Sequence, residues 1–338
     1  MKTRRIGRTA LHVTELGFGG ASLGNLYQPV APGNVEAVLD AAWNGGIRYF
    51  DTDPHYGFGL SERRMGDFLR GKPRDAYVLS TKVGRLLRPV PEDQVPDVGF
   101  VDPLPFKLEY DYSYDGIMRS VEFSYARLGL NRIDMLYVHD IGVYTHGIEA
   151  TRIHLGQLLD GGLKALEELK SSGTISAYGL GVNEVEVCLN VLARAPLDCI
   201  LLAGRYSLLD RSAEAALLPL CRERGTSLVI GGVFNSGILA TGPVPGAHFD
   251  YGPPSEEISA KVTAMQRIAA KDGYPLAAAA LQFPLHEPAV ASVLIGTAKP
   301  SSLERNLAQL QTEVPQGAFE KYRPYTTVQP PLTGAVRE

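Results

Sequence analysis

Four polar side chains of complementary chemistry stand at or just beyond the ends of short apolar stretches. They are Asp51 and Tyr56 in YFDTDPHYG, Lys82 in LSTKVG and His139 in MLYVHD. The phenol of a tyrosine has an ordinary pKa of about 10. A nearby lysine ammonium would lower that pKa, and an aspartate would keep the lysine charged and in place. Since a histidine beside them can hydrogen-bond a substrate oxygen, the set predicts proton transfer at a carbonyl or alcohol carbon.

The elements that carry these residues predict a parallel α/β fold. Asp51, Lys82 and His139 close or follow apolar runs, and polar residues at successive strand ends share one pocket at the top of a parallel barrel. The expected strands are residues 13–19, 48–51, 77–81, 135–139, 177–182, 199–202, 228–231 and 292–295. The expected helices are residues 34–44, 61–69, 113–128, 158–171, 185–193, 213–224, 256–271, 275–285 and 302–311.

Eight strand–helix units without a long polar linker predict one (β/α)8 TIM barrel, residues 1–338, rather than a doubly wound sheet. The chain has 338 residues, and such a barrel needs about 250, which leaves room for an N-terminal hairpin and long βα loops. Residues 84–112 and 140–155 lack periodicity and are expected to be such loops, which are often lids or insertions. The Pro-rich C-terminal tail from Pro315 is expected to be irregular.

Composition argues against several classes of partner. A net charge of −4 gives no support to nucleic-acid or anionic-membrane binding. The N-terminus lacks the apolar core of a secretory signal, and the longest apolar stretches fall short of the roughly 20 residues that span a bilayer. Cys188, Cys199 and Cys221 form no ligand pattern, so we expect buried thiols and no metal site. We expect a cytoplasmic monomer or homodimer that acts on a small molecule.

Three longer segments carry a resemblance to a known family. The segments RRIGRTALHVTELGFGG, GIRYFDTDPHYGFGLSERRMG and RIDMLYVHD resemble the aldo-keto reductase superfamily. The resemblance implies a barrel with a catalytic tetrad of Asp51, Tyr56, Lys82 and His139. It also implies a nicotinamide cofactor bound without a Rossmann domain, and no GxGxxG follows a strand in this chain. GASLGNLY, LLAGRYSLLD and GGVFNSGILATG are similar to the branch of L-fucose, D-threo-aldose and L-galactose 1-dehydrogenases and of pyridoxal 4-dehydrogenase.

The same resemblance assigns cofactor contacts. It places the nicotinamide carboxamide at Asn183, although Val182 replaces the serine that usually precedes it, and the nicotinamide ring on Tyr206. The remaining contacts that it implies are Asn235, Ser236, Gly237 and Leu239 in FNSGIL, then Gly296, Ser302 and Asn306 in the segment IGTAKPSSLERN. Small residues in a turn suit a pyrophosphate.

One of these positions bears on the choice between NAD and NADP. Ser302 stands where many NADP-using relatives place a basic residue for the 2′-phosphate, and an arginine fork is the usual phosphate partner. Its absence there favours NAD as the cofactor. NADP stays possible through Lys299.

Three functions remain open at this stage. The first is oxidation of the anomeric carbon of an aldose to a lactone, and pyridoxal, which cyclises to a hemiacetal, would react in the same way. The others are general NADPH-dependent carbonyl reduction and a non-catalytic binding role. Trp43, the only tryptophan, is expected to pack on the barrel shell, so we expect a pocket for a small polar substrate.

Overall fold

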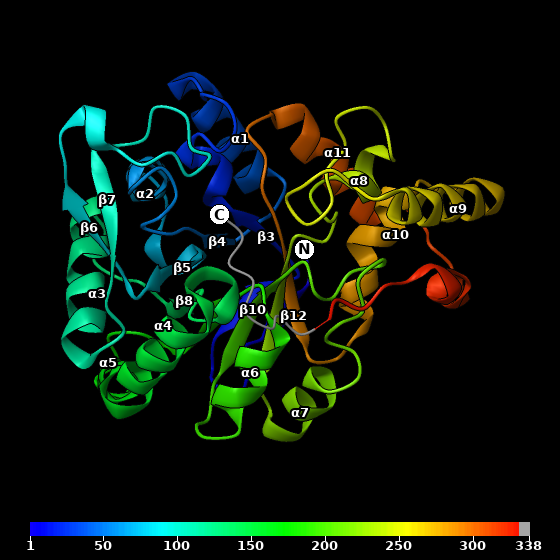
Figure 1. Cartoon of the computed structure of the whole chain (residues 1–338). Coiled ribbons are helices and arrows are strands. Elements are labelled where there is room, and N and C mark those ends of the chain that lie inside the picture. The colour runs from blue at the N-terminus through cyan, green and yellow to red at the C-terminus, as the bar shows by residue number, and fades with distance from the viewer. Residues whose placement is uncertain (331–338) are drawn as a thin grey trace.

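Eight parallel strands close into a barrel that helices surround (Figure 1). The computed structural model describes residues 1–330. Around the barrel the order is β10-β11-β12-β3-β4-β5-β8-β9, which confirms the predicted (β/α)8 architecture. The strands are β3 (Leu16–Gly19), β4 (Tyr49–Asp51), β5 (Val78–Val83), β8 (Met135–His139), β9 (Ala177–Val182), β10 (Cys199–Ala203), β11 (Ser227–Gly231) and β12 (Val290–Ile295).

The helices begin and end at residues that suit helix termini. The Ser113 and Ser255 side chains accept hydrogen bonds from N–H groups of the first turn, and Gly129 and Gly273 end their helices with positive φ. The helices are α1 (Pro32–Asn44), α2 (Leu60–Arg70), α3 (Tyr114–Leu128), α4 (Val143–Gln157), α5 (Leu163–Ser171), α6 (Val185–Leu192), α7 (Leu217–Arg224), α8 (Ile238–Thr241), α9 (Glu256–Asp272), α10 (Leu276–Gln282) and α11 (Pro300–Gln311). Within residues 1–330, no helix combines the length and the apolar character needed to cross a membrane.

Alternation along the strands divides the core into two parts. In β8, Leu136 and Val138 belong to the large cluster between the strands and the helices, whereas Met135 and Tyr137 belong to the cluster inside the barrel. Successive side chains of a strand point to opposite faces. His139 therefore continues the inward row of β8.

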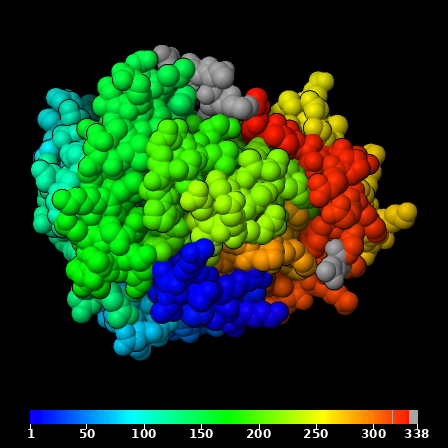
Figure 2. Space-filling model, turned by 90° about the horizontal axis from the view of Figure 1, so that it is seen from below, coloured from blue at the N-terminus to red at the C-terminus, as the bar shows by residue number. Residues whose placement is uncertain are grey.

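An N-terminal hairpin, also predicted, covers the end of the barrel where the strands begin. Its strands are β1 (Thr3–Arg5) and β2 (His12–Thr14), and Ile6 and Val13 join the cluster inside the barrel. The Arg4 guanidinium donates to the carbonyl of Val290, the first residue of β12. Figure 2 shows this N-terminal segment, in blue, exposed between the green and orange parts of the chain. The opposite end of the barrel is left for the strand ends that carry the polar residues.

Three segments expected to be irregular contain regular structure. Residues 84–112 include an antiparallel pair, β6 (Arg85–Pro89) and β7 (Phe106–Tyr110). Adjacent leucines hide the alternation in β6, whereas β7 (FKLEY) does alternate and was overlooked within a stretch rich in Pro and Asp. Residues 140–155 mostly form α4, which Gly147 interrupts with a φ of 69°. The tail forms a 3-10 helix over Gln316–Tyr325. Residues 331–338, also part of the predicted tail, lie outside the described residues.

Gly66 in α2 lies at the close contact between α2 and α3, two helices that flank the site. A Cβ atom at Gly66 would lie 2.0 Å from the Leu128 carbonyl oxygen of α3. We expect Gly66→Ala to destabilise the protein by about 1–3 kcal/mol in denaturant unfolding, the usual cost of overpacking. Gly156→Ala is the matched control, because that helical glycine has open space around it, and it should stabilise by up to about 1 kcal/mol. Equal effects of the two variants would contradict the close α2–α3 packing.

Candidate active site

Strand parity and register bring three of the four predicted residues together. Asp51 lies beside Ser80 in the β4–β5 register, Lys82 lies beside Tyr137 in β5–β8, and His139 lies beside Gly181 in β8–β9. A Cβ atom at Gly181 would lie 3.1 Å from the Tyr137 Cβ and 3.5 Å from the Lys82 Cδ. Glycine at this position therefore makes room for the long lysine side chain.

Lys82 is a buried ammonium with a full set of acceptors. Its Nζ lies 2.8 Å from Asp51 Oδ2, 3.0 Å from the Thr52 carbonyl oxygen and 3.2 Å from the Tyr56 hydroxyl. The other carboxylate oxygen of Asp51 accepts a hydrogen bond from the Ser80 hydroxyl at 2.6 Å. These contacts join Asp51, Tyr56 and Lys82 as the sequence predicted.

Tyr56 comes from the turn between β4 and α2 rather than from a strand. The next residues adopt positive φ, with values of 64° at Gly57 and 53° at Phe58. A Cβ atom at Gly57 would lie 2.5 Å from the Gly24 carbonyl oxygen, so glycine is required there for close approach as well as for backbone conformation. The turn sends the phenol back over the end of β5.

Burial sets the proton affinities of these groups. Burial raises the pKa of Tyr56 to about 12, and Lys82 opposes that rise only in part. The sequence predicted that Lys82 lowers the tyrosine pKa, and it does, but desolvation of the phenolate outweighs the single ammonium and the net pKa is raised. Asp51 and Tyr56 hold the pKa of Lys82 above its ordinary value despite burial. Burial, helped by Arg85, holds the pKa of His139 well below its ordinary value, so the imidazole is neutral near pH 7.

Charged groups that the sequence reasoning missed surround His139. Its Nδ1 lies 2.7 Å from Asp53 Oδ2, although the two atoms lack the alignment of a hydrogen bond. Its Nε2 lies 3.2 Å from Asp140 Oδ2, which pairs with the Arg85 guanidinium at 2.7 Å. The signal was present, because each aspartate closely follows a predicted strand end, but spacing alone does not show which carboxylate turns inward.

A cavity of about 390 Å³ opens above these residues. Tyr56, Lys82, His139 and Asn183 line it, whereas Asp51 is buried beneath Lys82. Loops supply the rings of Tyr27, His55, Phe100 and Tyr251 to its wall, and the first turn of α4 supplies the ring of Tyr144. The His55 ring meets the edge of the Phe100 ring with 5.2 Å between centroids. The cavity is thus polar at its floor and aromatic around its walls.

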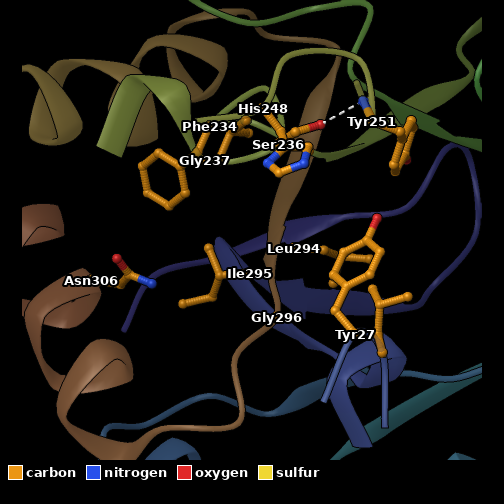
Figure 3. Close-up of a pocket in the computed structure, with 13 residues that line it drawn as sticks. Tyr27, Phe234, Ser236, Gly237, His248, Tyr251, Leu294, Ile295, Gly296 and Asn306 are labelled. Carbon is orange, nitrogen blue, oxygen red and sulfur yellow. Dashed lines mark hydrogen bonds between the residues drawn. The ribbon is translucent and has the colours of Figure 1, made fainter. Parts of the chain in front are cut away.

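A second cavity, of about 720 Å³, adjoins the first and shares Leu26, Tyr27 and Tyr251 with it. Four of the expected cofactor residues line it: Ser236, Gly237, Gly296 and Asn306. Figure 3 shows Asn306 across the cavity from Tyr27 and Tyr251, and the Ser236 hydroxyl accepts from the Tyr251 N–H at 3.0 Å. The second cavity has two glycines in its wall and adjoins the cavity that Tyr56 lines, so the two together have room for an extended dinucleotide.

The other expected cofactor residues are placed differently. Tyr206, Asn235 and Leu239 are buried, and the Tyr206 ring packs 5.0 Å from that of Phe283. In the Asn235–Leu239 turn, the N–H groups of residues 235, 237, 238 and 239 donate to carbonyls of residues 232–235. This turn therefore offers fewer free donors than its composition suggested. Its contribution to the cavity wall is Ser236 and Gly237.

Ser302 lies in the first turn of α11, and the structure adds a neighbour that the sequence argument did not weigh. The Arg305 guanidinium donates to the Ser302 hydroxyl at 2.9 Å. A positive charge thus stands beside the position where the sequence indicated none. Arg305 is one turn further along the helix, and a search for a basic residue at position 302 alone overlooks it.

Comparisons with known proteins point to one family. The model of the aldo/keto reductase family matches residues 15–323. The chain is 48% identical over 322 residues to pyridoxal 4-dehydrogenase of Microbacterium luteolum, covering 92% of this chain and 94% of that protein. It is 40% identical over 314 residues to D-threo-aldose 1-dehydrogenase of a Pseudomonas species, covering 91% and 93%. The solved holo form of an aldo-keto reductase from Bacillus halodurans superposes with a TM-score of 0.76 at 27% identity, covering 100% of this chain and 98% of that chain.

Removal of the buried ammonium should cost stability in a pH-dependent way. Lys82→Met leaves the Asp51 carboxylate buried without its counterion, and breaking such a pair costs about 3–5 kcal/mol. Burial already raises the pKa of Asp51, so this carboxyl takes up a proton as the pH falls and the loss should shrink in acid. The control is Lys72→Met, whose more exposed pair with Asp40 should matter by less than about 1 kcal/mol. A pH-independent loss in urea unfolding would contradict the pairing.

Proposed function

We propose, from the premise that this chain belongs to the aldo/keto reductase family, that it oxidises the hemiacetal carbon of a cyclic substrate to a lactone. Members of this family are oxidoreductases that use nicotinamide cofactors. The observation that carries the proposal is the Tyr56 hydroxyl, 3.2 Å from the Lys82 ammonium, in the wall of a cavity that His139 also lines. A hemiacetal carbon bears a hydroxyl group, which loses its proton, and a hydrogen, which leaves as hydride in such an oxidation.

In the proposed reaction, Tyr56 takes the proton from the hemiacetal hydroxyl. Lys82 stabilises the phenolate that accepts it, and Asp51 and the Thr52 carbonyl hold the ammonium in place. His139 hydrogen-bonds the reacting oxygen as a neutral imidazole. A nicotinamide cofactor held at this site would supply the hydride acceptor, so that the C–H and O–H bonds break and the C–O bond becomes C=O. Asn183, Ser236, Gly296 and Asn306 are the residues proposed to hold the cofactor.

The proton affinity of Tyr56 sets the direction that each pH favours. With a pKa of about 12, the phenol keeps its proton at neutral pH and can act as an acid toward a carbonyl. Oxidation needs the phenolate. As long as the pH is below that pKa, the phenolate fraction increases tenfold for each unit by which the pH rises. Oxidation should therefore accelerate through the alkaline range, and reduction should not.

The rings around the cavity bear on the substrate. The sequence pointed first to an aldose through its resemblance to the sugar-oxidising branch. It pointed to a small polar substrate because Trp43 was expected on the shell, and Trp43 does stack on Phe50. The loops nevertheless bring Tyr27, Phe100 and Tyr251 to the cavity wall. Aromatic walls favour a flat ring over a puckered, hydroxyl-covered one, since ring faces stack. Together with the 48% identity to pyridoxal 4-dehydrogenase, this lining favours pyridoxal as the substrate.

An aldose is the second candidate substrate. Asp140 and His55 add polar groups to the cavity, and sugar hydroxyls need such partners. The relative named D-threo-aldose 1-dehydrogenase supports the same candidate. Both substrates present the hemiacetal carbon that the proposed chemistry requires.

A substrate panel tests the proposal. The purified protein is assayed with pyridoxal, L-fucose, L-galactose and D-arabinose, each with NAD and NADP, and the product is checked as a lactone. We expect turnover of at least one hemiacetal, with pyridoxal the best substrate. Reduction of simple aldehydes with NADPH and no hemiacetal oxidation would instead indicate a general carbonyl reductase. The absence of any turnover would favour a binding role.

Tyr56→Phe should remove the proton acceptor while keeping the ring. We expect oxidation to fall by at least about 10²-fold, the lower end of what positioned acid–base groups contribute. Cofactor affinity, measured by fluorescence titration, should stay nearly the same. Tyr77→Phe is the control, because Tyr77 is a buried phenol in the outer cluster, and its turnover should not change. A Tyr56→Phe enzyme with more than about a tenth of normal turnover would refute the role of Tyr56.

We further propose that NAD is preferred and that NADP is accepted through Arg305. Ser302 brings no charge to the position implied for a 2′-phosphate, but Arg305 donates to its hydroxyl and Lys299 precedes the same helix. A charge-assisted hydrogen bond to a phosphate contributes roughly 1.5–3 kcal/mol. This contribution is large enough to appear in a comparison of the two cofactors.

Arg305→Gln should lower kcat/KM for NADP by about tenfold to a hundredfold and leave that for NAD nearly unchanged, since each 1.4 kcal/mol is a factor of ten. In the unaltered protein, kcat/KM for NAD should equal or exceed that for NADP. Arg194→Gln, which removes an exposed guanidinium of the segment after α6, controls for net charge. Equal losses with both cofactors would show that Arg305 has no part in the choice.

A further inference from the structure

Asp53 is a fully buried carboxylate that the four predicted residues leave unexplained. One of its oxygens accepts a hydrogen bond from the His55 N–H within the turn that leads to Tyr56. The other oxygen, Oδ2, lies 2.7 Å from His139 Nδ1 and 3.9 Å from Lys82 Nζ, and within residues 1–330 no donor is aligned with it. A buried carboxylate oxygen without an aligned donor is costly, so its retention needs a reason.

Asp53 acts on Lys82 through charge rather than through a hydrogen bond. An ammonium has three protons, and those of Lys82 are taken by Asp51, the Thr52 carbonyl and Tyr56. Two carboxylates therefore share one ammonium, and only Asp51 bonds to it directly. The negative charge of Asp53 offsets part of the positive charge that Tyr56 meets.

We propose that Asp53 is a positioning residue of this site, which orients the imidazole of His139 and moderates the charge that Lys82 presents to Tyr56. The proposal rests on the proposed function, in which Tyr56 exchanges the proton. Asp53 does not line the cavity. It acts on three residues that do, namely Tyr56, Lys82 and His139.

The charges around Tyr56 determine in which direction loss of the Asp53 charge should shift the pKa of Tyr56. The titratable and charged groups near Tyr56 and Asp53 are Asp51 of β4, His55 of the following turn, Lys82 of β5, Arg85 of β6, His139 of β8, Asp140 after β8 and Tyr251 of the loop before α9. Among them, Lys82 lowers the pKa of Tyr56, whereas Asp51 and Asp53 raise it. Neutralising Asp53 should therefore make Tyr56 easier to ionise, the opposite of removing Lys82.

Asp53→Asn separates this role from that of a turn residue. The amide oxygen of asparagine can still accept from the His55 N–H, so the turn keeps its hydrogen bond and only the charge is lost. Asp210→Asn is the matched control, because Asp210 is equally buried, accepts from the Ser212 N–H and leaves its Oδ2 unaligned, 3.8 Å from Arg205. Asp53→Ser, which also keeps an acceptor oxygen, is measured in parallel so that the result does not depend on one variant folding.

The first measurement is the ionisation of Tyr56 in the free protein. The near-ultraviolet difference spectrum between each protein and its Tyr56→Phe counterpart is followed up to about pH 10.5, where a phenol with a pKa of about 12 is ionised to a few per cent, so that the onset of the phenolate signal is compared. In Asp53→Asn, the phenolate signal should appear at a pH about one unit or more lower than normal, because one nearby charge shifts a pKa by about 1–3 units. The alkaline rise of oxidation should move to lower pH by a similar amount, whereas Lys82→Met should move it to higher pH.

The second measurement is the state of His139. Selective ¹⁵N labelling of histidine reports which ring nitrogen carries the proton, and Asp53→Asn should change the ratio of tautomers at His139, while Asp210→Asn should not. The proposal is overturned if Asp53→Asn and Asp53→Ser match Asp210→Asn in both measurements, or if the ionisation of Tyr56 moves to higher pH. Because both measurements need neither substrate nor cofactor, they decide the role of Asp53 even if no hemiacetal is oxidised.

Discussion

The buried ammonium of Lys82 is the constraint around which the site is arranged. Taking such a charge out of water costs several kcal/mol, and only close, well-placed partners offset this cost. Asp51 on the neighbouring strand supplies the counterion at 2.8 Å, and the Thr52 carbonyl supplies a second acceptor. The β4–β5 register brings Asp51 close to Lys82, and the small Gly181 on β9 leaves room for the lysine side chain. The geometry around Tyr56 then follows from where Nζ is held.

The same burial that makes Lys82 a strong electrostatic partner makes Tyr56 a weak acid. A low-dielectric site strengthens the attraction between ammonium and phenolate, and it also penalises the phenolate for leaving water. The penalty is the larger of the two here, so the pKa of Tyr56 lies above that of a free tyrosine. Two carboxylates, Asp51 and Asp53, add to it. Tyr56 therefore keeps its proton at neutral pH and loses it only to a strong base or at high pH.

The sequence predicted the residues that strands position, and Tyr56 from the turn after β4, but it missed Asp53, Phe100 and Arg305. Asp51, Lys82 and His139 follow from apolar runs and strand parity, which one chain displays directly. Asp53 turns inward because of a tight turn, and Phe100 reaches the cavity from the long connection between β6 and β7, where no strands were expected. Arg305 was overlooked because a charge one helical turn away occupies the space that a single position was expected to fill. Local patterns carry no record of such long-range approaches.

This division between strands and loops separates chemistry from specificity in the molecule. Asp51, Lys82 and His139 lie on the inward rows of β4, β5 and β8, where neighbouring strands hold the backbone, and Tyr56 reaches them from the turn after β4. The rings of Tyr27, Phe100 and Tyr251 come from segments outside the barrel, and Tyr27 and Tyr251 also border the second cavity. Substitutions at those rings can alter the shape offered to a substrate without moving Lys82. One barrel can thus keep its acid–base centre while its loops select between a sugar and a flat heteroaromatic ring.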